Sequence, residues 1–405
     1  MVSKLPFPHI SSILIFAFSV TAVPKFQAEP NFANDIAPII KKKCLPCHQP
    51  GGIGPFDFTT YRNFNRHIDL IRIQVLSRNM PPTRATSDFE PLAIAPPLTD
   101  QEIVIFQKYE AAKLPEGKPL TEPITREHDP AQFKPTKIIA SPKSLPVRAE
   151  GPTYWQTHTF PITEPINLSG LTVLPNRPGV LRSAQFAILA PGFKPPAQNT
   201  EPSIFLDIPG LTQLGSWAPG FPDWQLPSHT TKTISKGSHL IVITKVQPSG
   251  KPEDGDFKLG LLTAKSPAPN ELEVITFSKP DFIIKANESP TFTLGKKLTQ
   301  SAELIGLIPQ ARYYAGQIEA ELQIDNSNVQ SLLKVPKWDP LWIGSYLYPK
   351  PITLPAGADL QFKFTYFNDE KCLMNENKSP EDVSSGPNLT DEVCRMHILI
   401  SRPRR

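Results

Sequence analysis

Residues 360–366 read Leu-Gln-Phe-Lys-Phe-Thr-Tyr, so apolar and polar side chains alternate along the segment. Successive side chains of a β-strand point to opposite faces of a sheet, and the alternation therefore predicts a strand over 360–367 with one buried and one solvated face. Five further segments have β character: residues 184–190, 239–246, 257–263, 317–324 and 395–401. Short strands punctuated by Gly and Pro favour antiparallel β-sandwiches in this part of the chain.

Proline is unusually abundant, at 48 of 405 residues. Because proline lacks a backbone N–H and cannot continue a helix, its spread along the chain argues against a large helical bundle. With 39% apolar and 20% charged residues, the chain has enough apolar side chains to form buried cores. The formal net charge is +4 and no basic stripe interleaved with aromatic residues occurs, which gives nucleic-acid binding no support.

The first 22 residues are typical of a secretory signal peptide. Lys4 precedes an apolar run over 10–20, and small residues follow at Val20-Thr21-Ala22. The run is too short to cross a bilayer comfortably, so we expect cleavage, and no membrane span unless the signal stays uncleaved. We therefore predict a bacterial protein that is periplasmic or secreted, in an oxidising compartment.

Cys44-Leu45-Pro46-Cys47-His48 has the C-x-x-C-H pattern of c-type haem attachment. Two thiols add across the two vinyl groups of the porphyrin, and the adjacent histidine becomes an axial ligand of the iron. The motif predicts one covalent haem c on Cys44 and Cys47, with His48 as a ligand. A redox dithiol and a structural disulfide are the alternative interpretations of the two cysteines.

Met80 is the candidate sixth ligand of this iron. It lies 32 residues after His48, in Arg78-Asn79-Met80-Pro81-Pro82, where two prolines restrict the loop. The alternative for a lone methionine is packing in a core, for which a polar loop is a poor place. A Met/His ligand pair would raise the reduction potential of the haem.

Helical periodicity surrounds the motif at 31–43, 61–77 and 99–113, and Thr99 opens the last segment with a capping-box pattern. Helices, haem motif and methionine loop together favour a small, all-α, class-I-like cytochrome c domain. Lys41-Lys42-Lys43, directly before the motif, are either a docking face for an acidic redox partner or a solvated helix end, where cations suit the helix dipole.

The other two cysteines, Cys372 and Cys394, flank a mostly polar segment. In an exported chain we expect them to form a disulfide that ties this loop to the last strand, with a contribution on the order of 3 kcal/mol. A metal site with two thiolates is the alternative, but no pair of histidines lies nearby in the sequence.

Residues 30–118 resemble the cytochrome c module found beside copper type II, ascorbate-dependent (peptidylglycine monooxygenase-like) domains in bacteria. The matching stretches cover the module from end to end: 34–39, 44–48, 50–56, 78–82 and 98–103. A weaker resemblance to the paired jelly-roll domains of copper type II monooxygenases follows at 215–220, 248–253, 338–342 and 390–394. The expected chain is multidomain: a signal peptide (1–22), an N-terminal all-α class-I-like cytochrome c (30–118), a proline-rich linker (119–146) and two all-β jelly-roll sandwiches (147–270 and 271–405).

In that family one copper site carries electrons and the other binds oxygen. The ligands are a His-His pair, a single His, a His-x-His and a Met. The resemblance puts other residues at these positions: Ala184-Gln185, Lys245 or Gln247, Gln310-Ala311-Arg312 and Val393. None of them binds copper as an imidazole or thioether would. The histidines that remain are scattered, at His128, His158, His229, His239 and His397, and we expect no copper.

These features predict an exported monohaem c-type cytochrome that exchanges electrons with a redox partner protein, while its β-sandwiches serve binding or docking. Whether the chain is also an enzyme stays open. The main alternative is a copper-dependent monooxygenase with rearranged ligands that receives electrons from its own haem. In a third interpretation, a labile Met80 position makes the haem a ligand sensor or a peroxidase.

Overall fold

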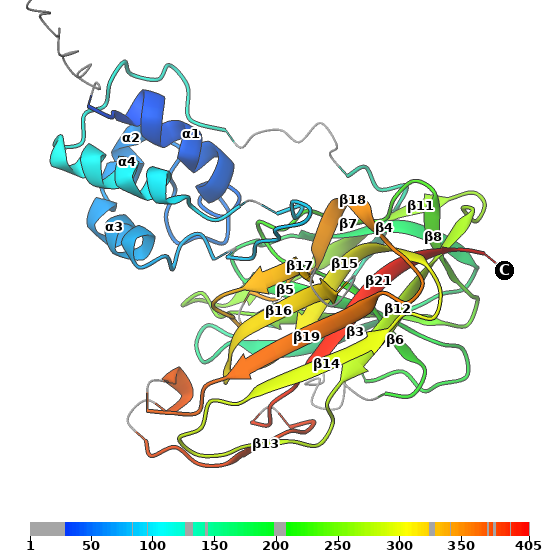
Figure 1. Ribbon diagram of the computed structural model, residues 1–405. Coiled ribbons are helices and arrows are strands. Elements are labelled where there is room, and N and C mark those ends of the chain that lie inside the picture. Colours follow the sequence, from blue (N-terminus) through cyan, green and yellow to red (C-terminus); the bar gives the residue numbers. More distant parts are fainter. Residues whose placement is uncertain are drawn as a thin grey trace, which may run out of the picture.

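The computed structural model describes residues 29–404 apart from 83, 95, 126–132, 142–144, 198–207, 324–328, 341, 371, 376–377 and 389. The predicted signal peptide (1–22) and His128 lie outside the described residues. In Figure 1 the helices, coloured blue to cyan, lie together at one end of the molecule, and the strands form the larger remainder.

Short helical elements make up the N-terminal region: η1 (Phe32–Ile36), α1 (Ala37–Ile39), η2 (Ile40–Cys44), α2 (Tyr61–Asn65), α3 (Ile68–Leu76) and α4 (Asp100–Ala111). Pro38 cannot donate a backbone hydrogen bond, and the expected helix over 31–43 consists of two π-helical turns around the three residues of α1. Helix α4 begins at the expected capping box, in which Thr99 Oγ1 accepts from the backbone N–H of Glu102 and the Glu102 carboxylate accepts from that of Thr99.

One nine-stranded sheet runs through the whole β region. Its order is β1 (Lys137–Ala140), β11 (Phe257–Ala264), β4 (Ile166–Pro175), β8 (Thr230–Ile234), β12 (Asn270–Ser278), β21 (Arg395–Pro403), β15 (Ala302–Gln310) and β18 (Tyr346–Leu354), with β7 (Trp224–Gln225) paired to β4.

Two four-stranded sheets lie against it, in the orders β3 (Tyr154–Pro161), β9 (His239–Val246), β5 (Leu181–Leu189), β6 (Leu211–Trp217) and β14 (Thr291–Lys297), β19 (Asp359–Tyr366), β16 (Ala315–Gln323), β17 (Val329–Val335). Two short pairs complete the strands: β2 (Pro146–Val147) with β10 (Glu253–Asp254), and β13 (Ile283–Ile284) with β20 (Val383–Ser384).

Two apolar cores lie between these sheets. In the first, Phe186 of β5 and Val242 of β9 pack with Leu259 of β11, which belongs to the nine-stranded sheet. In the second, Phe362 of β19 packs with Ile398 of β21. Each core is therefore enclosed by one four-stranded sheet and one half of the long sheet, so the expectation of two β-sandwiches is confirmed.

Strand β19 shows how the sequence pattern produces this packing. Its residues are alternately half-buried and buried from Asp359 to Tyr366, and the four apolar side chains at 360, 362, 364 and 366 are fully shielded from solvent. The alternation predicted for 360–367 is confirmed. The strands expected at 184–190, 239–246, 257–263, 317–324 and 395–401 are likewise present, within a few residues at each end.

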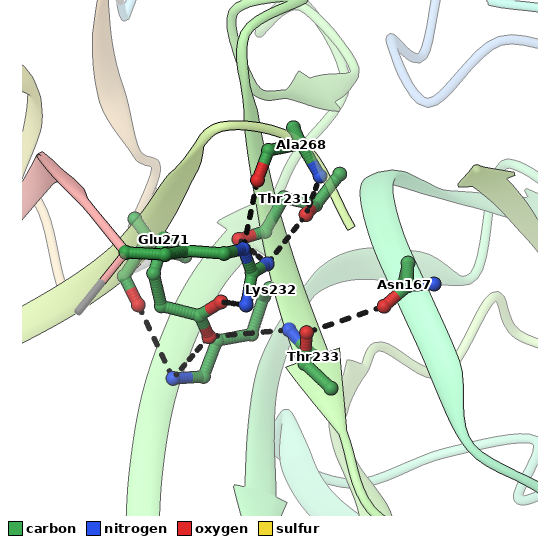
Figure 2. A network of polar contacts seen from close by, with 8 residues as sticks. Asn167, Thr231, Lys232, Thr233, Ala268 and Glu271 are labelled. Atoms are coloured by element: carbon green, nitrogen blue, oxygen red, sulfur yellow. Dashed lines mark hydrogen bonds and ion pairs between the residues drawn. The ribbon is translucent and has the colours of Figure 1, made fainter. Parts of the chain in front are cut away.

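The two sandwiches join where β8 pairs in parallel with β12, at Thr230 opposite Asn270 and Thr231 opposite Glu271. Figure 2 shows the polar network at this seam. The Glu271 carboxylate lies 3.2 Å from Nζ of Lys232 and 2.5 Å from Nη1 of Arg404, and it accepts from the backbone N–H of Thr233. The network connects β8 of the first sandwich to β12 of the second and to Arg404, directly after β21.

The predicted fold class is wrong in its first part. The described residues contain four α-helices of three to twelve residues, so the chain is mostly β-sheet and has no N-terminal all-α class-I-like cytochrome c domain. The helical region also bonds to the second sandwich: Thr86 and Lys334 form an antiparallel β-bridge, and the N–H of Ala93 donates to the carbonyl of Leu347. Periodicity overestimated the α-helices because it takes no account of the break between α2 and α3, nor of the π-helical turns on either side of α1.

None of the helices in the described ranges has the length and apolar character that crossing a bilayer requires.

Candidate functional site

The Cys44–His48 motif folds into a tight turn at the end of η2. The backbone N–H groups of Cys47 and His48 both donate to the carbonyl of Cys44, at 3.1 and 2.9 Å. The N–H of Gly54 then donates to the carbonyl of Cys47, and that of Phe58 to the carbonyl of His48. These bonds hold the two cysteines and the histidine close together in one short turn.

The imidazole of His48 is fixed in one orientation. Its Nδ1 lies 3.1 Å from the carbonyl oxygen of Phe56, so Nδ1 carries the hydrogen and Nε2 keeps its lone pair. The ring stacks on Phe58 with centroids 4.2 Å apart. A Cβ at Gly54 would approach Nδ1 to 2.5 Å, so a glycine is needed beside the ring.

The protonation state of His48 also suits a ligand. Burial lowers the pKa of its imidazole below the ordinary value, and the hydrogen bond to the Phe56 carbonyl opposes this only in part. The structure gives Nε2 no hydrogen-bond partner among the described residues. A neutral imidazole with an available Nε2 is the form that coordinates iron.

Neither Cys44 nor Cys47 is disulfide-bonded. Burial, followed by the neighbouring Cys47, raises the pKa of the Cys44 thiol to about 12. The Cys47 sulfur lies 3.8 Å from the carbonyl oxygen of Pro219, in the loop after β6. The raised pKa keeps Cys44 a neutral thiol at neutral pH, so Cys44 is not the thiolate that a reactive dithiol needs.

Met80 lies in a loop beyond the C-terminus of α3 and is 41% exposed. Arg84 holds this loop, since Nε donates to the carbonyl of Arg78 and Nη2 to that of Asn79, at 3.0 Å each. Lys337 of the second sandwich donates to the Asn79 side chain. No contact recorded for the described residues joins Met80 to His48, and the role of Met80 as sixth ligand stays a prediction.

The lysines before the motif differ in environment. Lys43 is 6% exposed, and its Nζ lies 2.5 Å from the Glu102 carboxylate and 2.8 Å from the carbonyl oxygen of Pro97. Lys42 is exposed and Lys41 half-buried. Lys43 therefore fastens the motif to α4, and only Lys41 and Lys42 remain for a docking face.

Two expectations from the sequence, a metal-binding cytochrome c and a disulfide between Cys372 and Cys394, need correction. Among the described residues, no three His, Cys, Asp or Glu side chains gather as a site built from protein ligands alone would require, and the region has no all-α cytochrome fold, so the structure gives no support to the description of the chain as a metal-binding cytochrome c with haem. The expected disulfide is also absent, because Cys372 and Cys394 are both unbridged. Cys372 lies half-buried in a turn after β19, whereas Cys394 is buried in the second core, where burial raises the pKa of its thiol to about 12.

Lys245, at one of the copper-ligand positions that the resemblance implies, lies in β9 and is 2% exposed. Its Nζ donates to the carbonyl of Pro340 at 2.9 Å and lies 4.8 Å from the centre of the Trp155 ring. Burial lowers the pKa of Lys245 to about 8, although Asp339 opposes the shift. The position holds an amine that links the two sandwiches.

The structure brings Arg312 and Val393, two more of these positions, to one place. Both their backbone N–H groups donate to Oε1 of Glu392, and the N–H of Tyr314 donates to Oε2 at 2.8 Å. Burial raises the pKa of Glu392 to about 7, although these hydrogen bonds oppose it. Sequence reasoning missed this buried carboxylate; its only signal was its place directly before Val393.

The histidines of the β region lie apart. His158 Nε2 is 2.8 Å from Thr244 Oγ1 and His397 Nδ1 is 2.9 Å from Thr276 Oγ1; burial lowers the pKa of His158 to about 4 and that of His397 to about 3. His229 Nε2 lies 2.7 Å from the Glu303 carboxylate. Each of these three is thus bonded within its own strand pair or seam.

A cavity of about 840 Å³, here called the seam cavity, opens beside the motif. Its lining includes Pro46 and residues 49–53, from the motif and the turn after it, and the loop 217–223 at the end of β6. Residues of β18, together with Pro175 and Pro178, also line it. The cavity therefore lies between the helical region and both sandwiches.

No family model and no curated protein matches this chain. Among solved structures, a mutant VP2 protein of infectious bursal disease virus is 9% identical, with 68% of this chain and 72% of that chain covered and a TM-score of 0.19. A structure of Sulfolobus turreted icosahedral virus is 13% identical, with 70% of this chain and 100% of that chain covered and a TM-score of 0.15. A β-porphyranase of glycoside hydrolase family 86 from Bacteroides plebeius is 8% identical, with 62% of this chain and 35% of that chain covered and a TM-score of 0.16. Such low TM-scores carry no argument about fold or function, so no family is assigned to the chain.

Proposed function

We propose that this chain is exported, carries one haem bound covalently to Cys44 and Cys47 with His48 as an axial ligand, and exchanges electrons with a redox partner protein. The observation that supports it best is the environment of His48. Its Nδ1 is held by the Phe56 carbonyl, and Nε2 is left without a partner among the described residues. Metal-ligating histidines generally have this arrangement.

The proposal needs neither an all-α cytochrome fold nor a cluster of three protein ligands. The porphyrin supplies four ligands to its iron, so one or two side chains complete the coordination. When bound, the haem would supply reversible one-electron transfer. The protein's own part is to hold the imidazole neutral and oriented, and to keep the two cysteines in one turn.

The β-sandwiches fit a binding or docking role in this proposal. The positions at which the resemblance implies copper ligands hold Lys245 and Arg312, and both make hydrogen bonds that tie segments together. Cationic side chains do not bind copper. No observation favours the monooxygenase alternative, and a measurement of copper in the purified protein would test it.

The test uses the full chain expressed with its own leader in a bacterium that matures c-type haem. Mass spectrometry of the exported protein should show the added mass of one porphyrin, and a reduced-minus-oxidised spectrum should show c-type bands. Cys44→Ser together with Cys47→Ser should abolish the covalent mass. An exported, folded protein with neither the added mass nor the bands contradicts the proposal.

His48→Ala and His67→Ala form a matched pair of variants for the same test. His67 stacks on Phe56 at 3.9 Å, close to His48 but outside the motif. Loss of the c-type spectrum in His48→Ala, with retention in His67→Ala, is expected. Equal spectra in the two variants would exclude His48 as the axial ligand.

A further inference from the structure

The seam cavity has the size and position of a small-molecule site. Its volume of about 840 Å³ falls within the roughly 300–1,000 Å³ of ordinary ligand pockets. It lies where three parts of the chain meet, and junctions between domains are preferred places for ligands. A second cavity, beside α3 and α4, measures only about 10 Å³.

Aromatic residues and prolines make up half of the lining residues. Phe133, Trp217, Phe221 and Tyr348 contribute aromatic side chains, and eight prolines come from loops and from strands β4 and β18. Phe221 and Tyr348 are buried, so their rings are held by the cores behind them. A wall of this kind is rigid before a ligand arrives, which limits the entropy lost on binding, and it offers flat apolar surfaces to a flat apolar partner.

The wall also carries polar groups. Among its side chains these are Gln49, Asp223 and Gln225, together with the hydroxyl of Tyr348, which donates to the carbonyl of Leu332. The amides of Gln49 and Gln225 make no hydrogen bond among the described residues, whereas Asp223 accepts one from the Thr172 hydroxyl. Each amide can donate and accept, so the two match hydroxyl groups, which also do both.

Charge excludes one large class of ligands. No Lys, Arg or His side chain belongs to the described lining, and the one charged group is the Asp223 carboxylate. An anion such as a phosphate or a carboxylate would lose its hydration and meet only a like charge. The cavity thus selects against anions and for uncharged molecules.

We propose that the seam cavity binds an uncharged aromatic molecule bearing one or more hydroxyl groups, a ligand of the phenol class. The ring would lie against the aromatic and proline walls, and the hydroxyls would bond the amides of Gln49 and Gln225. Sugars share the hydroxyls but have no aromatic face to lie against the rings and prolines. The site goes beyond the proposed electron transfer and requires no haem.

Isothermal titration calorimetry on the full-length exported protein tests this, with catechol, glucose and benzoate as probes. Saturable binding of catechol, at least tenfold tighter than that of glucose or benzoate, is expected. Gln49→Ala and Trp217→Leu should each weaken catechol binding by tenfold or so. Gln74→Ala, which removes a half-buried glutamine side chain of α3 outside the cavity, should leave it unchanged.

The Cys44→Ser/Cys47→Ser variant tests ligand binding in the seam cavity independently of the proposed haem attachment. Catechol should bind that variant as it binds the parent protein, whatever its spectrum. No saturable catechol binding, equal or tighter binding of glucose or benzoate, or an affinity unchanged by both Gln49→Ala and Trp217→Leu would overturn the proposal. Near-ultraviolet circular dichroism on each variant checks that the fold is retained.

Discussion

The ammonium group of Lys43 lies 2.5 Å from the carboxylate of Glu102. The two side chains are 3% and 22% exposed, and the same carboxylate accepts from the backbone N–H of Thr99 at 2.7 Å. One glutamate therefore caps α4 and holds the residue directly before Cys44. The pair connects the start of one helix to the turn that carries the candidate haem ligands.

Glu102→Gln should destabilise the protein, because it leaves the buried Lys43 ammonium without a countercharge. A loss of about 2 kcal/mol in the free energy of unfolding is expected, which is below the cost of breaking a fully buried pair because Glu102 is partly solvated. Urea denaturation at pH 7 measures it. Asp100→Asn, which alters an exposed partner of Arg78 in the same helix turn, should change the stability by less than about 0.5 kcal/mol.

Glu102 also predicts a loss of stability in acid. Burial acts to raise the pKa of Glu102, but the hydrogen bonds from Lys43 and Thr99 outweigh it, and the pKa lies below its ordinary value. A depressed folded-state pKa gives stability that is present above the unfolded pKa of about 4.3 and is lost as the pH falls through the folded value. Unfolding curves between pH 6 and pH 3 should show this loss in the parent protein and a flatter dependence in Glu102→Gln.

Glu392 predicts the opposite slope at higher pH. Burial raises the folded-state pKa of Glu392 to about 7, which lies above its unfolded-state pKa. The contribution of Glu392 to the free energy of unfolding is therefore full below about pH 4.5 and is lost as the pH rises through 7. A fall of about 2 kcal/mol in the free energy of unfolding between pH 5 and pH 8 is expected from this group. In Glu392→Gln the fall should disappear, whereas stability at pH 5 should be lower, because the amide nitrogen cannot accept from the N–H of Tyr314.

Met80→Ala tests the sixth ligand of the proposed haem. Loss of a Met ligand should change the oxidised spectrum and lower the reduction potential, since Met/His ligation raises it. Met374→Ala is the control, because Met374 is about as exposed, at 44% against 41%, and lies in the turn after β19. An unchanged spectrum and potential in Met80→Ala would mean that the iron has another distal ligand or none from this loop.

Glu271→Ala should weaken the seam between the two sandwiches. The Glu271 carboxylate is 24% exposed and pairs with Lys232 and Arg404. Its removal therefore leaves two partly buried cations without this countercharge. A loss of about 1–2 kcal/mol is expected. Glu319→Ala, whose carboxylate lies 4.0 Å from Lys334 on a more exposed face, should cost clearly less. Equal effects of the two substitutions in thermal unfolding would contradict a special role of the seam.

The sequence by itself determined the local features. The alternation in 360–367 predicted β19, and Thr99 with Glu102 predicted the start of α4, because a side-chain period and a helix cap depend on residues only a few positions apart. The same locality explains the error in the helical region. Apolar spacing over 61–77 fitted one helix, but a break at Arg66 and His67 divides it into α2 and α3. The segment over 32–44 is helical throughout, yet only three of its residues are α-helical.

Only the tertiary structure decided how the parts join. The parallel pairing of β8 with β12, the burial of Lys43 against Glu102 and the clamp of Glu392 on Arg312 all connect residues at least 38 positions apart. The seam cavity likewise needs three distant segments to form its walls. Such contacts depend on which buried faces meet when the sheets pack and on how much apolar surface is thereby removed from water. Both depend on residues far apart in the sequence, so no short stretch of the chain predicts them.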